Sequence, residues 1–114
     1  MDWITQICNN DSVIKNIVFD DDDVVVTIEF WNGEDKKLTF KNYWAIKEKN
    51  SIGKTIGDIF VNTNSILLSE LEDDILKGDG SQEEIRNIKS IVFMDVWEPE
   101  IMLLEILADS VELN

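Results

Sequence analysis

Histidine is absent from this sequence, and its absence excludes several kinds of catalytic site. Histidine is the commonest general base, the base partner of many nucleophilic serines and cysteines, and the commonest metal ligand in proteins. The chain therefore lacks the side chain on which most hydrolase mechanisms depend. We expect a protein that is not an enzyme, with no catalytic residues and no cofactor.

Cysteine, proline and long apolar runs are also scarce. Cys8 is the single cysteine, so the chain can form neither an internal disulfide nor a cysteine-based zinc site, as is typical of a reducing compartment. The sequence begins Met1-Asp2-Trp3, without the basic region of a signal peptide, and no stretch approaches the roughly 18 apolar residues of a membrane span. With one proline and no repeat, we expect a single cytoplasmic domain over residues 1–114 that does not contact a membrane.

Basic residues are few compared with acidic ones. The 114 residues include 24 Asp and Glu but only 10 Lys and Arg, which gives a net charge of −14. Residues 1–35 have nine acids and one base, residues 36–57 have one acid and six bases, and residues 58–114 have fourteen acids and three bases. This balance opposes binding to phosphates, so we expect no nucleic acid partner. The lysine-rich middle either pairs with the acidic segments or forms a separate surface patch.

Apolar residues make up 44% of the chain, and their spacing in its first half predicts one short helix followed by strands. The expected elements are a helix at 2–9 and strands at 13–19, 24–31 and 38–46. Asn32-Gly33 supplies the left-handed backbone of a hairpin turn between the last two strands. Trp44 shares the apolar face of the returning strand, so we expect it in the core.

The second half predicts a longer helix and a closing hairpin. A loop at 50–64, with a short strand at 59–61, leads to a helical stripe formed by Leu67, Leu68, Leu71, Ile75 and Leu76. The helix starts near Ser65, or later if Ser69 and Glu72 form a capping box, and Gly78 is its natural end. Ser81 and Glu84 repeat the capping pattern and predict a further helical turn, before strands at 86–97 and 101–111.

Together these segments predict an α+β fold. We expect a twisted antiparallel β-sheet of about five or six strands, a short N-terminal helix at one end and one longer helix packed on a face.

Clustered acids are the first candidate site. Four consecutive aspartates, Asp20, Asp21, Asp22 and Asp23, interrupt the strand pattern and therefore lie at a turn or a strand end. Such a run is a solvated turn, a patch that binds a protein, or a site for Mg²⁺ or Ca²⁺; consecutive side chains project in different directions, so we expect no metal. The acids Glu70, Asp73 and Asp74 lie on the polar side of the longer helix and present the same choice between solvation and partner binding.

Tryptophans beside acids are the second candidate. Trp31 ends the predicted strand 24–31, on the same face as Glu29 and opposite the face of Val24. An exposed tryptophan supplies buried area in an interface while a neighbouring acid engages Arg or Lys. The alternative is that the longer helix covers this face and buries Trp31. At the closing hairpin the same combination is formed by Trp97, Glu98 and Glu100.

Three features together resemble a known group of proteins: a helix containing Trp3, the hairpin VVVTIEFWNGEDKKLTFKNYW, and the closing strand LLEILAD in a small acidic chain. This combination is similar to the immunity proteins of bacterial polymorphic-toxin and contact-dependent inhibition systems, over most of the chain. The resemblance implies a non-enzymatic inhibitor that binds one cognate toxin domain, commonly a basic nuclease, and neutralises it inside the producing cell. The partner-binding residues expected on this reading are Asp20, Asp21, Asp22, Asp23, Glu29, Trp31, Glu70, Asp73, Asp74, Trp97, Glu98 and Glu100.

Other functions stay open at this stage. The chain is alternatively a structural or homo-oligomeric module, in which the lysine-rich strand of one copy meets acids of another. An enzyme that uses carboxylates and a divalent metal is a further alternative, as is a phage-type inhibitor of a host nuclease. The sequence does not set the oligomeric state.

Overall fold

A computed structural model describes residues 2–78 and 87–114, which contain two helices and eight strands. In chain order the elements are α1 (Asp2–Cys8), β1 (Val13–Asp20), β2 (Asp23–Glu29), β3 (Asp35–Lys41), β4 (Ala45–Glu48), β5 (Ile56–Val61), α2 (Ile66–Lys77), β6 (Lys89–Asp95), β7 (Met102–Ala108) and β8 (Ser110–Leu113). The predicted α+β class is confirmed. The helical turn predicted at Ser81 and Glu84 lies outside the described residues.

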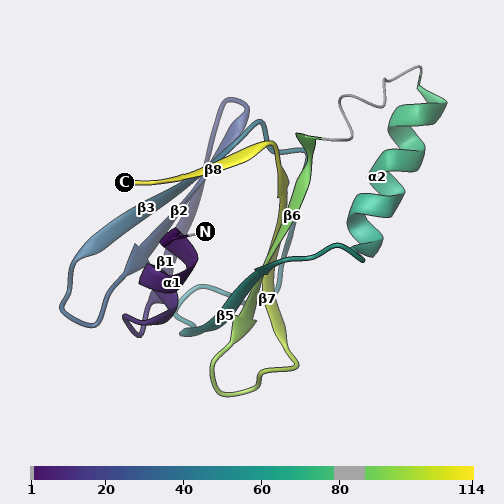
Figure 1. Cartoon of the computed structure of the whole chain (residues 1–114). Helices are drawn as coiled ribbons and strands as arrows, with labels where there is room; N and C mark the ends of the chain where they lie inside the picture. Colours follow the sequence, from purple (N-terminus) through teal and green to yellow (C-terminus); the bar gives the residue numbers. More distant parts are fainter. Residues whose placement is uncertain (1, 79–86) are drawn as a thin grey trace.

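The strands form two antiparallel sheets of four strands each, so the prediction of one sheet with five or six strands is wrong (Figure 1). The first sheet has the order β1-β2-β3-β8 and the second has the order β4-β7-β6-β5. Two segments that each read as one strand bend and continue into the other sheet. The segment 38–46 supplies the end of β3 and the start of β4, and the segment 101–111 supplies β7 and the start of β8.

Both bends occur at one corner, where the paired strands β3 and β8 continue as the paired strands β4 and β7. Asn42 has a left-handed backbone with φ of 49°, which turns the chain after β3. The carboxylate of Asp109, between β7 and β8, accepts hydrogen bonds from the Asn42 side-chain amide at 3.1 Å and from the Trp44 indole Nε1 at 3.1 Å. Trp44 is 39% exposed, so its predicted core position is wrong, because the bend removes it from the buried face of β3.

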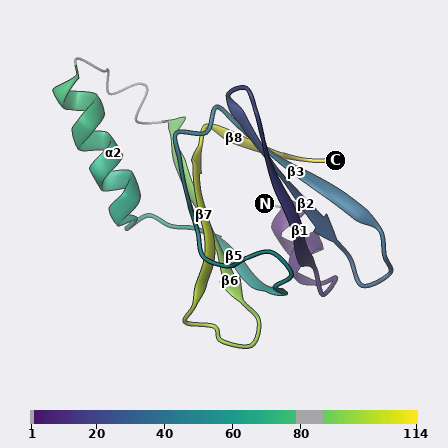
Figure 2. The same ribbon diagram turned by 180° about the vertical axis from the view of Figure 1, so that it is seen from behind.

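The core lies between the two sheets, which face each other when the molecule is seen from either side (Figures 1 and 2). Alternate residues of β2 from Val24 to Ile28 are fully buried, as their spacing predicts. The rings of Phe40 in β3 and Phe93 in β6 meet across the core, with centroids 6.1 Å apart. Helix α1 contacts β5, and its Ile7 is completely buried, which confirms the predicted short amphipathic helix at one end of the core.

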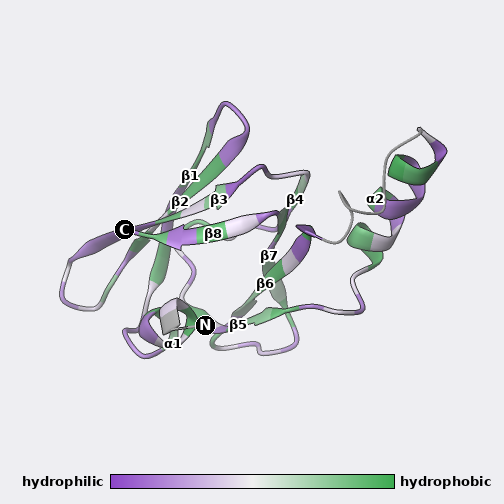
Figure 3. Ribbon diagram, turned by 45° about the horizontal axis from the view of Figure 1, so that its top comes forward, coloured by the Kyte–Doolittle hydropathy of each residue, from purple (hydrophilic) through white to green (hydrophobic). Residues whose placement is uncertain are grey.

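The turns between the strands of the first sheet are hydrophilic, as the purple ends of the β1–β2 and β2–β3 hairpins show (Figure 3). The β2–β3 turn is closed by a hydrogen bond from the Phe30 N–H to the Glu34 carbonyl at 2.8 Å. Gly33 has φ of 84° in this turn, so the predicted Asn32-Gly33 hairpin is confirmed.

Helix α2 begins and ends where capping chemistry predicts but does not pack on a sheet face. The Ser65 side chain accepts a hydrogen bond from the Leu68 N–H, which selects Ser65 over Ser69 as N-cap, and Gly78 is the C-cap. None of its residues is buried, and the helix stands away from both sheets (Figures 1 and 2). The prediction of a helix packed on a face is therefore wrong, because each sheet already buries the inner face of the other.

Neither described helix is both long enough and apolar enough to cross a lipid bilayer.

Candidate functional site

The residues predicted to bind a partner do not form one site. They lie on four separate parts of the molecule, which are far from one another in both views (Figures 1 and 2). These parts are the β1–β2 turn with Asp20 to Asp23, the end of β2 with Glu29 and Trp31, helix α2 with Glu70, Asp73 and Asp74, and the β6–β7 turn with Trp97, Glu98 and Glu100. A single partner surface therefore includes only some of them.

The aspartate run forms the β1–β2 turn, and its members differ in environment. Asp20, Asp21 and Asp22 are exposed, and none of the ion pairs among the described residues includes them. Asp23 instead faces β3, where its carboxylate accepts hydrogen bonds from the Asn42 backbone N–H at 3.1 Å and from Lys41 Nζ at 3.2 Å. These donors, the Asn42 N–H first, hold the pKa of Asp23 below its ordinary value. We call Asp20, Asp21 and Asp22 the acidic turn.

A metal site is not formed by these acids. Within residues 2–78 and 87–114, no three acidic or cysteine side chains converge closely enough to hold a metal ion. Asp23 is turned toward Lys41, away from the arrangement that a shared cation requires.

Both candidate tryptophans are exposed at turns. Trp31 is 72% exposed in the β2–β3 turn, so the alternative in which the longer helix buries it is wrong. Trp97 is 84% exposed in the β6–β7 turn, beside the exposed Glu98 and Glu100. Glu29 is half-buried on β2 and lies 3.6 Å from Lys15 Nζ, so its charge is partly neutralised. The two tryptophans are therefore exposed aromatic side chains on separate turns.

The acids of α2 lie on a solvated helix. Glu70, Asp73 and Asp74 are exposed, and none of them joins an ion pair or side-chain hydrogen bond among the described residues. Their position fits the polar side of an amphipathic helix, which is the plainer of the two readings that their sequence allows.

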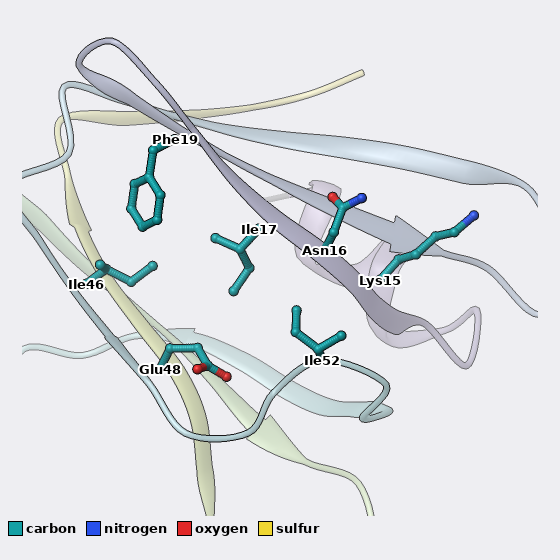
Figure 4. A pocket seen from close by; sticks show the side chains of 7 residues that line it. All are labelled: Lys15, Asn16, Ile17, Phe19, Ile46, Glu48 and Ile52. Carbon is teal, nitrogen blue, oxygen red and sulfur yellow. The ribbon is translucent and has the colours of Figure 1, made fainter.

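The structure contains a groove that sequence reasoning missed. It is a cavity of about 380 Å³ between the edge strand β1 of the first sheet and the edge strand β4 of the second (Figure 4). We call it the β1–β4 groove; its lining residues are Lys15, Asn16, Ile17, Phe19, Ile46, Glu48 and Ile52.

The groove is apolar because inward-facing side chains of the two edge strands extend past the covered part of the core. Ile17 and Phe19 lie opposite Val26 and Val24 of β2, and so belong to the inner face of the first sheet. Val24 and Val26 are fully buried, whereas Phe19 is 56% exposed. In Figure 4, Ile17 and Phe19 point toward Ile46 across the groove.

The acidic turn continues directly from this apolar surface. Asp20 follows Phe19 in the chain, and the Phe19 ring lies 5.6 Å from the Tyr43 ring between centroids. The Tyr43 N–H donates to the Asp22 carbonyl at 2.9 Å, which ties the turn to the segment between β3 and β4. Three exposed carboxylates, the exposed Phe19 ring and the partly buried Tyr43 ring therefore form one surface here, and this is the best candidate for a functional site.

One carboxylate lies in the groove itself. Glu48 Oε2 accepts hydrogen bonds from the Ser51 N–H at 2.5 Å and from the Ser51 hydroxyl at 2.7 Å. These two bonds, the one from the backbone N–H first, hold the pKa of Glu48 below its ordinary value. The groove is thus an apolar surface with a fixed negative charge on one wall.

Glu105 is the other acid whose position the sequence did not reveal. It is buried on β7, where its Oε2 accepts hydrogen bonds from the Ser65 hydroxyl and, at 2.5 Å, from the Ser90 hydroxyl. Since Ser65 is also the N-cap of α2, Glu105 joins that helix to the second sheet. The sequence did contain a signal for this: Glu105 is an acid within the apolar run of the closing strand LLEILAD, and an acid in such a run indicates a buried carboxylate with hydrogen-bond donors.

No protein-family model, characterised protein or solved structure matches this chain.

The β1–β4 groove could not be read from local patterns because its walls are about thirty residues apart in sequence. The available signal was in β1, where Ile17, Val18 and Phe19 are consecutive apolar residues. A strand that is apolar on both faces is expected in the centre of a sheet. Here the strand lies at the edge of its sheet, so both apolar faces reach the surface.

Proposed function

We propose that this protein is a non-enzymatic inhibitor that binds and neutralises a cognate bacterial toxin domain, a basic nuclease, in the cytoplasm of the producing cell. The observation that supports the proposal is the continuity of the acidic turn with the exposed Phe19 ring and the partly buried Tyr43 ring at the end of the β1–β4 groove. The resemblance of the chain to immunity proteins supplies the class of partner.

The chemistry of this surface suits a basic protein. Aromatic and aliphatic side chains supply the desolvated area on which affinity depends, and three exposed carboxylates supply a local negative field. The net charge of −14 steers a basic partner toward the molecule at long range. The acidic turn then takes the place of nucleic acid phosphates in the basic cleft of the nuclease.

The separation of the candidate residues in the structure reduces the number that one partner can contact. Because the α2 acids and the β6–β7 turn lie on other parts of the molecule, we assign the main contacts to Asp20, Asp21 and Asp22 with the groove. The exposed Trp31 and Trp97 are second anchors for a partner that wraps around either end of the sheets.

The test is binding to the purified product of the adjacent gene. The triple variant Asp20→Asn, Asp21→Asn and Asp22→Asn is expected to bind about tenfold or more weakly, mainly through a slower association rate. The matched control carries Glu70→Gln, Asp73→Asn and Asp74→Asn, which removes the same charge from α2 and is expected to bind within about twofold of the native protein. Calorimetry and stopped-flow mixing at two salt concentrations measure both quantities.

Two results would contradict the proposal. One is an adjacent gene whose product has no toxin-like domain and does not bind. The other is an equal loss of binding in the two triple variants, since long-range charge alone would then account for the effect.

A further inference from the structure

The outer edge of β1 is only partly paired. At its start, the Ile14 N–H donates to the Lys54 carbonyl at 3.0 Å, and the Gly53 N–H donates to the Ile14 carbonyl at 2.7 Å. Beyond Ile14, β1 pairs with β2 on one side and with no strand of the described residues on the other. The backbone of residues 16–20 is therefore an open edge in the part of the chain that the structure describes.

This edge is unusually apolar for an exposed strand. Val18 is 51% exposed on the outer face, and Phe19 is 56% exposed on the inner face, next to the half-buried Ile17. Edge strands are normally protected by charges, by bulges or by a covering segment, since their unpaired backbone groups pair readily with another strand. The bulge near Lys15 and the acidic turn protect the two ends of β1, but no described residue protects the stretch from Asn16 to Phe19 in these ways.

We propose that β1 pairs in antiparallel register with β1 of a second copy of this chain, about a twofold axis through Val18. The two first sheets then join into one continuous sheet of eight strands. This inference does not rest on the proposed function, since it concerns only the chain itself.

The side chains of β1 are complementary to themselves in this register. A twofold axis through Val18 places Ile17 opposite Phe19 of the second copy, both on the inner face of the joined sheet. On the outer face Asn16 lies opposite Asp20, and toward the ends of the pair Lys15 approaches Asp21. Apolar residues thus face apolar residues, and a lysine faces an acid at each end.

Other symmetric registers are worse. A shift of one pairing step in one direction places Asp20 opposite Ile14, whose edge is already bonded to Gly53 and Lys54. A shift in the other direction places Asp21 opposite Ile17 and Asp20 opposite Val18, so that acids face apolar residues. Only the register centred on Val18 avoids both conflicts.

The pairing also fills the β1–β4 groove. Because opposite residues of an antiparallel pair share a face, Ile17 and Phe19 of the second copy lie on the groove side of the joined sheet. They extend the apolar surface toward Ile46 and Ile52, of which Ile52 is 53% exposed in the single chain. Self-association and binding of a basic partner at this groove therefore exclude each other.

Salt dependence separates this proposal from the proposed function. Two copies that each carry a net charge of −14 repel one another, so added salt strengthens their association. Binding to a basic partner responds to salt in the opposite sense.

Sedimentation equilibrium of the native protein is the first measurement. We expect a reversible dimer whose dissociation constant falls when NaCl is raised from about 50 mM to about 500 mM. Phe19→Lys is expected to raise that constant about tenfold or more. Phe60→Lys is the matched control, since Phe60 is 38% exposed on β5, an edge strand of the other sheet. The dissociation constant of this variant should equal that of the native protein.

Cross-linking tests the register directly, in a Cys8→Ala background. With Val18→Cys, the two new cysteines lie opposite each other across the twofold axis, within the reach of a disulfide, and mild oxidation is expected to yield a covalent dimer. Asn16→Cys is the control on the same face of the strand. Its two copies are offset by four residues, about 14 Å, and are not expected to cross-link.

The proposal is overturned by a monomer at both salt concentrations up to about 0.5 mM protein, where association would be weaker than about −4 kcal/mol. It is also overturned by a dimer that Phe19→Lys leaves intact, or by equal cross-linking of the two cysteine variants. Each of these results would leave the binding test with the adjacent gene product unaffected.

Discussion

Individual carboxylates in this protein serve different purposes according to the donors around them. Asp23, Glu48, Glu105 and Asp109 accept hydrogen bonds that connect strands, loops and a helix. The carboxylates of the acidic turn receive no such bond from the described residues and are exposed to solvent. The ion pairs among the described residues are partly exposed, such as Lys15 with Asp35 at 3.0 Å, and contribute little to stability.

Glu48 is expected to make stability depend on pH. Its pKa in the folded protein lies below the ordinary value because of its bonds to Ser51, so its contribution is complete above the ordinary pKa and is lost as pH falls through the lower folded pKa. Glu48→Gln is therefore expected to be less stable than the native protein at pH 7, with a difference that shrinks toward pH 3. Urea unfolding at a series of pH values measures this difference.

Glu70→Gln on α2 is the control for that measurement, since none of the described side-chain hydrogen bonds involves Glu70. A stability difference for Glu48→Gln that stays constant or grows as pH falls would contradict the assignment of the Ser51 bonds to an ionised Glu48.

At the scale of elements, α2 differs from the strands because it is capped but not packed. Its N-cap, Ser65, is buried and donates its hydroxyl hydrogen to Glu105 while accepting from the Leu68 N–H. The helix interior contributes no buried residue to the core. Helices of about twelve residues are marginal on their own, so this attachment at Ser65 has a large influence on α2.

Replacement of Ser65 is expected to loosen α2 alone. Ser65→Ala removes the cap and the bond to Glu105, at a cost of about 1–2 kcal/mol, or roughly 5- to 30-fold faster amide exchange in α2. Exchange in β6 and β7 should change much less. Hydrogen exchange followed by mass spectrometry measures both regions.

Ser69→Ala is the matched control for this experiment, because Ser69 is exposed on the same helix and does not cap it. Equal effects of the two substitutions on α2 would show that helix propensity, rather than the Ser65 cap, governs its stability.

For the whole molecule, the decisive feature is the corner at which two paired strands pass from one sheet to the other. It sets the two sheets face to face, so that Phe40 meets Phe93. It also leaves β1 and β4 as the edges that border the groove. Asp109 holds this corner through Asn42 and Trp44, and its own N–H donates to the Lys41 carbonyl at 3.0 Å.

Loss of the Asp109 carboxylate is expected to destabilise the fold as a whole. Asp109→Ala removes the acceptor of the Asn42 amide and the Trp44 indole, and because both groups are exposed and can bond to water instead, the cost is about 0.5–1.5 kcal/mol in the free energy of unfolding. Urea unfolding followed by tryptophan emission measures this loss, and Asp109→Asn, which retains one acceptor oxygen, should lose less.

Glu112→Ala, on the exposed side of β8, is the control for Asp109→Ala and is expected to lie within about 0.5 kcal/mol of the native protein. An Asp109→Ala variant as stable as this control would mean that the bend is maintained by the strand pairing alone.

Local patterns predicted most of the elements but not how they combine. The alternation around Val24, the Asn32-Gly33 turn and the Gly78 cap each depend on residues within a few positions, and each was confirmed. The bends at Asn42 and Asp109 were missed because the apolar pattern continues through them, so one strand and two strands look alike. The predicted contact residues were all acidic or aromatic, and the structure separates them among four turns and helix faces.

The sequence by itself determined the net charge of −14, the lack of histidine chemistry and the buried face of β2, since these depend on composition or on short-range spacing. Only the tertiary structure decided that Trp31 is exposed, that α2 stands away from the sheets, and that Phe19 borders a groove with Ile46. The physical reason is that the bend of two paired strands determines which apolar faces pack against each other. Apolar faces that this arrangement leaves uncovered, those of the edge strand β1 above all, remain exposed at the surface, where we propose that partners bind.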